Sequence, residues 1–405
     1  MVKRKELNFL EQIKYELPIF FLLLIRALPQ AINTSEDAYA SLLSLSYSEL
    51  GLAPRVVWGS FMGAFFDYYG ARQIVLFFTP LFVIFLFLIA VLIGKLIRDV
   101  DQEQKLGILL FSALFLAGPY SVAPFEARLF LPDRLLAFVS VLGLVLFNAR
   151  GFRWATPLIM IIGMATHQMF AFTYIPLFVF ILLYELYKKG FKKSELLFFS
   201  VNLVTVIAAT LYFYFAYSLF MREIPFEEMV KLAVVNTNLK VRGDMVLGYF
   251  MKDTAYVLFS MVFYSQEFKS AIVAYLKTFL FTLPMDIFFF LLWKKMYTDS
   301  KKIFQKVLSL ILVFFPLAVL PLFPVSSEFY RLRSASVLSQ FLLVFYLFYR
   351  KDETVLHYFK KISLLVQKHK TLALLILAYF AYSFASLSFS FSWSTFFFDF
   401  VVSSR

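Results

Sequence analysis

Two adjacent carboxylates, Glu36 and Asp37, follow the first apolar run of the chain and are the first residues that could do chemistry. Beside an apolar wall such a pair can act as a general base, because mutual repulsion and desolvation disfavour the charged form of one member. Paired carboxylates also suit a divalent cation. The structural alternative is a solvated pair at a helix end, with residues 33–35 as caps.

A second cluster surrounds the start of a later apolar run and contains Glu126, Arg128, Asp133 and Arg134. Pro132 fits the first position of a helix, and Asp133 fits its first turn. Arginines are hard to place near lipid without partners, and a guanidinium fork suits phosphate oxygens. The alternative is a set of internal salt bridges, Glu126 with Arg128 and Asp133 with a neighbouring arginine.

Two further clusters contain arginine or histidine. His167 stands between Thr166 and Gln168 in apolar surroundings, where it is either a satisfied structural group or a catalytic one. A histidine-based metal site is not expected, because the chain has no cysteine and the other two histidines lie in a basic stretch. The last cluster consists of Glu328, Tyr330, Arg331 and Arg333. It resembles a clamp for a lipid-linked phosphate or sugar hydroxyls, or else its arginines extend toward lipid headgroups.

The elements that must position these residues are long apolar runs. Stretches without any charged residue or histidine cover 73–94, 106–125, 196–221, 307–327 and 371–398. Each is close to or above the ~20 residues needed to cross roughly 30 Å of hydrocarbon. A hydrophobic fraction of 61% with 55 Phe in 405 residues excludes an ordinary soluble domain. We therefore expect an all-α, polytopic integral membrane protein, with residues 1–405 as a single membrane domain.

About eleven transmembrane segments are predicted. They are expected at 17–32, 74–96, 106–119, 135–147, twice within 154–184, and at 196–217, 271–293, 307–322, 334–349 and 371–391. Asp286 is an outlier within its apolar run, and Lys277 or a tyrosine is its expected partner.

Lysine and arginine gather in every second connection. These basic connections are Lys3–Lys5, 95–105, 150–153, 188–193, 294–306 and 350–370. The positive-inside rule places them, and with them the N-terminus, in the cytoplasm. The net charge of +13 then reflects orientation in the membrane, and nucleic acid is not an expected partner. The acids, arginines and His167 described above collect on the outer face.

Two outer connections, 33–73 and 222–269, are too long to be simple turns and are candidate substrate-site elements. The spacing of apolar residues in the first connection predicts short amphipathic helices at the membrane interface. The second connection is predicted to be a partly helical loop or lid. On the inner face, Val355, Phe359, Ile362 and Leu365 follow helical spacing and predict an amphipathic surface helix.

Several of these stretches, taken in order, resemble a known family. They are SEDAYASLL, GLAPRVVWGSFMGAFF, PDRLLAFVSVLGLVLF, GMATHQMFAFTYIPLF and EFYRLR. This order is similar to EpsG-like, Wzy-type polymerases of O-antigen or capsule polysaccharide. It also resembles GT-C membrane glycosyltransferases that use polyprenyl-phosphate sugars. One departure is Arg134–Leu135, where the family usually carries Arg-Gln.

The resemblance implies transfer of a glycan from a polyprenyl-diphosphate carrier to an acceptor sugar on the outer face of a bacterial inner membrane. Asp37 or Glu36 would be the base, and His167 would orient a phosphate or a hydroxyl. The substrate would be held by Arg128, Arg134, Arg331 and Arg333, with Tyr39, Glu328 and Tyr330 beside them. No cofactor is expected, although a divalent metal at Glu36 and Asp37 stays open. A flippase or a chain-length regulator is an expected partner, besides membrane lipid.

The competing class is a transporter or flippase of a polyprenyl-linked or anionic saccharide. It explains the arginines and the many helices equally well. It also predicts charges through the membrane midplane and internal repeats, whereas the charges here lie mostly at one face. An acyltransferase or another lipid-modifying membrane enzyme is a third alternative.

Overall fold

The protein is all-helical over the residues that its computed structural model describes, and no strand occurs among them. These residues are 13–31, 43–118, 131–149, 151–216, 219–237, 239, 241, 266–325 and 329–388. The all-α prediction is confirmed for this part of the chain.

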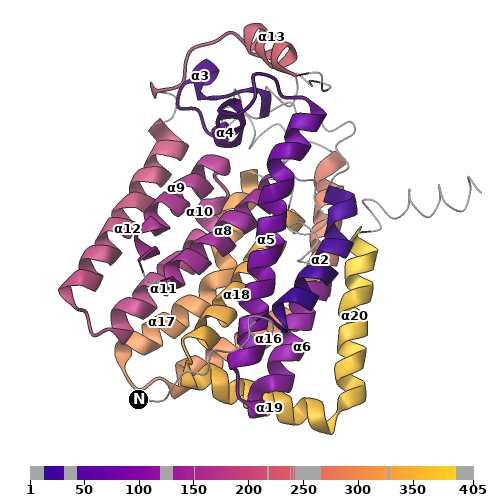
Figure 1. The fold of residues 1–405 in the computed structure, drawn as a ribbon. Coiled ribbons are helices and arrows are strands. Elements are labelled where there is room, and N and C mark those ends of the chain that lie inside the picture. The colour runs from indigo at the N-terminus through magenta and orange to yellow at the C-terminus, as the bar shows by residue number, and fades with distance from the viewer. Residues whose placement is uncertain are drawn as a thin grey trace, which may run out of the picture.

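The helices run mostly along one common direction (Figure 1). In chain order they are α2 (Glu16–Ala31), α3 (Tyr47–Leu50), α4 (Val57–Gly63), α5 (Ala71–Asp99), α6 (Gln102–Ala117), α8 (Pro132–Asn148), η3 (Arg153–Ala155), α9 (Thr156–Thr166), α10 (Phe170–Thr173), α11 (Ile175–Lys188), α12 (Lys193–Leu211), η4 (Tyr212–Ala216), α13 (Phe226–Asn236), α16 (Gln266–Asp299), α17 (Ile303–Phe314), η7 (Phe315–Val325), α18 (Phe329–Tyr349), α19 (Glu353–Lys368) and α20 (Lys370–Ser388).

Prolines set several of the helix boundaries. Pro132 occupies the first turn of α8, and α9 and α11 also begin with a proline in the first turn, where a missing N–H costs nothing. The sequence FPLAVLPLFPV makes η7 a 3-10 helix, because its prolines cannot donate α-helical hydrogen bonds. The stretch 154–184, where two membrane segments were predicted, holds α9 and α11 separated by the short α10, and neither helix is among the candidate spans.

Four helices are long and apolar enough to cross a membrane among the described residues: Ala71–Asp99, Lys193–Ala216, Ile303–Leu322 and Arg331–Tyr349. The bent pair Glu353–Lys368 and Lys370–Ala381 makes a fifth if it counts as one span. The prediction of about eleven spans is not confirmed. Most of the remaining apolar helices, such as the 16-residue α6 and the 11-residue α9, are shorter than the ~20 residues a span requires.

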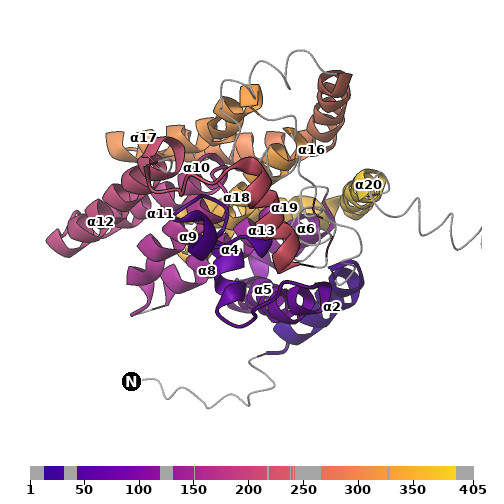
Figure 2. The ribbon, with the colours of Figure 1, turned by 90° about the horizontal axis from the view of Figure 1, so that it is seen from above.

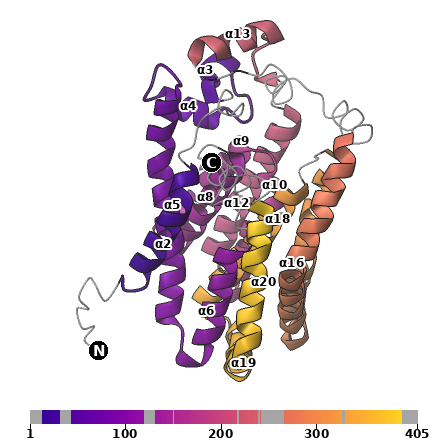
Figure 3. The ribbon, with the colours of Figure 1, turned by 90° about the vertical axis from the view of Figure 1, so that its right-hand side faces the viewer.

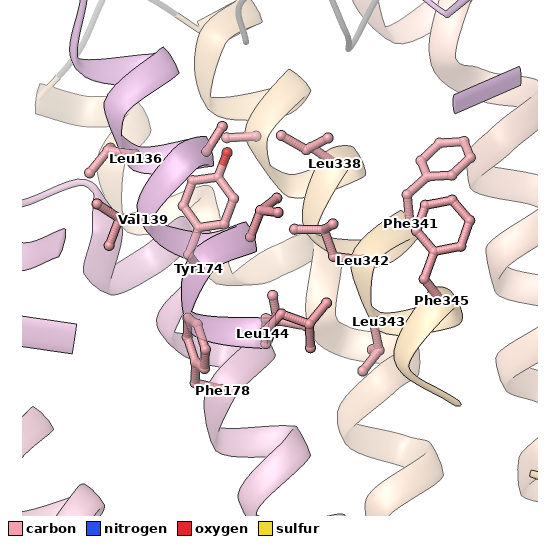
Figure 4. Close-up of a cluster of buried hydrophobic side chains, with 14 of the residues drawn as sticks. Leu136, Val139, Leu144, Tyr174, Phe178, Leu338, Phe341, Leu342, Leu343 and Phe345 are labelled. Carbon is pink, nitrogen blue, oxygen red and sulfur yellow. The ribbon is translucent and has the colours of Figure 1, made fainter. Parts of the chain in front are cut away.

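Helix α18 lies inside the bundle (Figure 2), and nearly all of its side chains from Arg331 to Phe348 are buried. Its apolar side chains face α8 and the α10–α11 region, where Leu136, Tyr174 and Leu338 belong to one cluster (Figure 4). The hydroxyl of Ser339 donates to the carbonyl of Thr173 at 2.6 Å. This packing fixes the position of the residues at the start of α18.

One end of the bundle carries a layer made of α3, α4 and α13 (Figures 1 and 3). The layer has its own small core, which includes Leu45, Leu50 and Met229. Backbone hydrogen bonds join its two chain segments, from Arg222 N–H to Leu50 O at 2.9 Å and from Tyr69 N–H to Asn236 O at 2.9 Å. Residues 43–70 and 219–237 therefore form one layer, and short helices occur in both stretches, as predicted.

Gly51 allows this close contact between the two segments. Its φ of +68° lies in the left-handed region, and a Cβ added there would meet the carbonyl oxygen of Phe220 at 2.5 Å.

The opposite end gathers the basic connections. Arg98 pairs with Glu16 at 2.6 Å, and Lys95 donates to the Tyr349 hydroxyl at 3.1 Å. Other pairs join Arg153 to Glu195, Lys189 to Glu185 and Glu195, and Arg350 to Glu185. The basic connections, which alternate along the sequence, thus lie together at one end of the molecule.

The amphipathic helix predicted around 355–365 is confirmed as α19, which follows the cap residue Asp352. Its side chains Val355 and Phe359 are buried against the bundle, and the N–H of Gly107 in α6 donates to the Ser363 hydroxyl at 2.8 Å. Leu365 is 58% exposed, so the apolar face is narrower than its spacing predicts.

Candidate functional site

A buried ion pair joins α8 to α18 at the end that carries the α3–α4–α13 layer. The Asp133 Oδ2 and Arg331 Nη2 atoms lie 2.5 Å apart, and each residue is only 8% exposed. Pro132 starts α8 and thereby places Asp133 in the first turn, while Arg331 lies in the first turn of α18. Asp133 Oδ1 is buried and accepts no hydrogen bond from any residue that the structure describes. A carboxylate oxygen with unused acceptor capacity is therefore present in the pair.

His167 lies in the turn between α9 and α10, outside the candidate membrane spans. Its Nδ1 accepts a hydrogen bond from the Met169 N–H at 3.2 Å, which leaves Nε2 as the donor of a neutral imidazole. Burial is the main cause that holds the pKa of His167 well below its usual 6.5, and the charges of Arg55 and Arg331 add to it. The imidazole is therefore neutral at pH 7 and has two guanidinium groups in its surroundings.

Arg55 is a member of this site that sequence reasoning missed. It lies in the loop between α3 and α4, and its Nη2 donates to Gln168 Oε1 at 2.9 Å. Its backbone N–H donates to the carbonyl of Ala165 at 2.9 Å. The spacing of apolar residues in 43–66 dominates the sequence pattern there, and no signal in it points to Arg55.

Two other arginines of the predicted clamp, Arg134 and Arg333, contact different neighbours. The guanidinium of Arg134 is 2% exposed and lies over the Phe82 ring of α5, 4.1 Å from the centroid. Arg333 pairs with Asp286 of α16. Asp286, for which Lys277 or a tyrosine was the expected partner, thus pairs with an arginine of α18. Of the two arginines in the EFYRLR stretch, the structure brings only Arg331 to His167.

Several predicted site residues lie outside the described part of the chain. They are Glu36, Asp37, Tyr39, Arg128 and Glu328, together with the side chain of Tyr330. No group of three or more His, Asp or Glu residues that could hold a metal occurs among the described residues. The metal alternative at Glu36 and Asp37 likewise lies outside the described residues.

The described site combines two guanidiniums, one carboxylate and one neutral imidazole. Such an arrangement suits a phosphate or another anion. Comparison of the chain with protein-family models, with curated proteins and with solved structures finds no match. Fold and site together define an all-helical protein with several helices able to cross a membrane and a cationic site at one end.

Proposed function

We propose that the protein is a membrane glycosyltransferase that transfers a glycan from a polyprenyl-diphosphate-linked donor to an acceptor sugar at the outer face. The observation that carries the proposal is the buried Asp133–Arg331 pair with His167 and Arg55 beside it. Ionisable residues buried in or next to a membrane are costly and are functional candidates by default.

Glycosyl transfer from such a donor needs stabilisation of the departing diphosphate. A guanidinium carries five N–H donors, so the pairing of Arg331 with Asp133 is compatible with further contacts to a diphosphate. Asp133 holds that guanidinium in place, and His167 can donate from Nε2 to a phosphate or sugar oxygen. These groups are aligned before the reaction, which is the condition for strong electrostatic stabilisation.

The reaction also needs a base at the acceptor hydroxyl. We assign this role to Asp37 or Glu36, because Asp133 is already occupied by Arg331. This base and the arginine site must converge on one substrate for the proposal to hold.

A lipid-linked donor is favoured over a free sugar nucleotide by the apolar surroundings. An apolar groove of about 340 Å³ opens between α11, α17 and η7, and its lining includes Pro176, Ile311 and Phe315. Since Pro176 follows the buried Tyr174 closely in the chain, the groove begins near the helices that carry the site. The apolar lining of this groove suits a part of a polyprenyl tail.

The experiment is a transfer assay with purified protein in nanodiscs. A polyprenyl-diphosphate-linked oligosaccharide serves as donor and acceptor, and mass spectrometry detects the new glycosidic bond. Wild type is compared with Asp133→Asn and with Lys360→Gln, a control that removes an exposed ion pair to Glu103 at the opposite end. Loss of product in the first variant alone is expected. Movement of the donor across a vesicle membrane without any new bond would contradict the proposal and favour the transporter class.

A further inference from the structure

We propose that the second oxygen of the Asp133 carboxylate and the hydroxyl of Tyr174 form a subsite that binds one hydroxyl group of the donor sugar. The proposal rests on the proposed function for the class of ligand, a sugar linked to a polyprenyl diphosphate. Its geometric basis is independent of that function.

The carboxylate of Asp133 is the first observation. Its Oδ2 pairs with Arg331, whereas Oδ1 is buried and accepts no hydrogen bond from any residue that the structure describes. A buried carboxylate oxygen without a donor is costly, and such atoms are rare in folded proteins. Because Asp133 is only 8% exposed, bulk solvent does little to compensate. A hydrogen-bond donor on a ligand satisfies this oxygen.

The hydroxyl of Tyr174 is the second observation. Tyr174 lies at the junction of α10 and α11 and is 2% exposed. Its hydroxyl points to the end of the buried cluster that Leu136 and Leu338 occupy, toward the first turns of α8 and α18 (Figure 4). It makes no hydrogen bond to another described residue, although buried tyrosine hydroxyls usually have a partner. It is therefore a second buried polar atom that can still take a ligand.

Helical spacing brings the two groups to the same place. Leu136 follows Asp133 by three residues and Leu338 follows Arg331 by seven, so each leucine shares a helix face with the charged residue. The ion pair thus lies roughly one to two helical turns beyond these leucines, in the direction in which the Tyr174 hydroxyl points. The carboxylate of Asp133 is near enough for its charge to act on Tyr174.

Both groups are held in position before a ligand binds. The Ser339 hydroxyl of α18 donates to the carbonyl of Thr173, the residue before Tyr174, at 2.6 Å. Asp133 is held by its pair with Arg331. Groups that are already oriented bind a ligand at a lower entropic cost.

The chemistry of the two groups selects a hydroxyl. A carboxylate only accepts hydrogen bonds, whereas a tyrosine hydroxyl both donates and accepts. A sugar hydroxyl between them donates to Asp133 Oδ1 and accepts from Tyr174. An ionised phosphate has no proton to donate and is repelled by the carboxylate. The diphosphate therefore binds on the side of Arg331 and the sugar on the side of Asp133 and Tyr174.

The variant Tyr174→Phe removes only the hydroxyl. Because this hydroxyl bonds to no described residue, the unfolding midpoint should change little. Affinity is measured by calorimetry in detergent for a bare polyprenyl diphosphate and for the same carrier bearing glucose, galactose or N-acetylglucosamine. At least one sugar-bearing carrier should bind about three- to tenfold more weakly than to wild type, and the bare carrier should bind equally well.

Tyr358→Phe is the matched control, because Tyr358 is a half-buried tyrosine of α19 at the opposite end. Its affinities should equal those of wild type. Equal weakening of the bare and the sugar-bearing carriers in Tyr174→Phe would mean that Tyr174 acts on the diphosphate, and would overturn the proposal. Unchanged affinity for every carrier would mean that the two groups bind water alone, and would overturn it as well.

Monodeoxy analogues of the responsive sugar identify the hydroxyl. Removing the hydroxyl that occupies the subsite should weaken binding to wild type more than binding to Tyr174→Phe, because the hydrogen bond from Tyr174 is already absent in the variant. The same factor in both proteins for every analogue would refute the assignment.

The inference and the proposed function can fail separately. Selective loss of sugar-bearing carriers in Tyr174→Phe, in a protein that forms no glycosidic bond, would support this inference and contradict the proposed function. Formation of the bond by a protein whose affinities do not depend on Tyr174 would support the proposed function and contradict this inference.

Discussion

Asp133 and Arg331 form a contact that neither residue's neighbours in the sequence reveal, since they begin two helices far apart in the chain. Each is costly to bury alone, and together they also join α8 to α18. Replacing either residue should therefore change the stability of the protein, apart from any effect on activity.

We predict that Asp133→Asn and Arg331→Gln each lower the free energy of unfolding by about 3–5 kcal/mol, because each leaves one buried charge without its partner. The double variant Asp133→Leu with Arg331→Met should be less destabilised than either single variant. Denaturation in detergent, followed as a double-mutant cycle, measures this coupling. Strictly additive effects would show that the two side chains do not interact.

His167 gives the site a pH dependence. Its pKa is lowered in the folded protein, so below about pH 6.5 the unfolded chain takes up a proton that the folded protein does not. Stability should therefore fall as the pH drops from 7.5 to 5.5, by about 1 kcal/mol more in wild type than in His167→Gln. Unfolding curves at the two pH values measure the difference. Equal losses in both proteins would mean that His167 titrates normally.

Sequence reasoning predicted part of this site at the residue scale. His167 and Arg331 were singled out because charge sorting placed them on one face, and the structure brings them together. Asp133 was placed in a helix first turn, and the structural alternative paired it with a neighbouring arginine, whereas the structure pairs it with Arg331, far away in the sequence. Arg55 was missed because the left-handed backbone that aims it depends on tertiary contacts and leaves no mark in apolar spacing.

At the scale of elements, the predicted segments match the helices. A long run of Phe, Leu and Ile bounded by charged residues is expected to form a helix, because a helix satisfies all its backbone hydrogen bonds internally in apolar surroundings. Predicted 135–147, for example, is α8 (Pro132–Asn148). The number of spans was not predictable in the same way. Helices such as α9 and α11 bury apolar residues inside the bundle, and composition alone does not separate such helices from those that cross a membrane.

The end of the molecule that carries α19 holds a network of hydrogen bonds and ion pairs that joins several helices. Glu185 of α11 accepts from the Tyr346 hydroxyl at 2.5 Å and pairs with Arg350 at 2.6 Å, while Tyr184 donates to the α19 cap Asp352 at 2.8 Å. Arg350, expected only as a charge that sets topology, is thus also a structural contact between α11 and α18.

Arg350→Gln should lower the free energy of unfolding by about 1–3 kcal/mol, because it removes a charge-assisted contact to a buried carboxylate. The adjacent Lys351→Gln should change it by less than about 0.5 kcal/mol. The comparison isolates the network from the general effect of losing one positive charge. Similar losses in the two variants would remove Arg350 from the network.

For the whole molecule, the two ends differ in chemistry. One gathers lysines and arginines around α19, and the other carries the α3–α4–α13 layer above the cationic site (Figure 3). The orientation in the membrane is a prediction from the positive-inside rule.

Single cysteines test this orientation directly, because the chain contains none. A cysteine at Ala64, exposed on the layer, should react with an impermeant reagent added outside intact cells, whereas one at Ser194 should react only after lysis. The reverse pattern would invert the topology and place the site in the cytoplasm.

The central claim, that the cationic end performs glycosyl transfer, is tested most directly by the transfer rate of Arg331→Lys. An ammonium retains the charge of the pair with Asp133 but cannot form the planar fork to a diphosphate. The loss of a contact of ~1.5–3 kcal/mol made in the transition state corresponds to a rate about ten- to a hundredfold lower. In the nanodisc assay we expect this loss with normal folding, while Lys360→Gln retains the wild-type rate. A wild-type rate of glycosidic bond formation in Arg331→Lys would contradict the account.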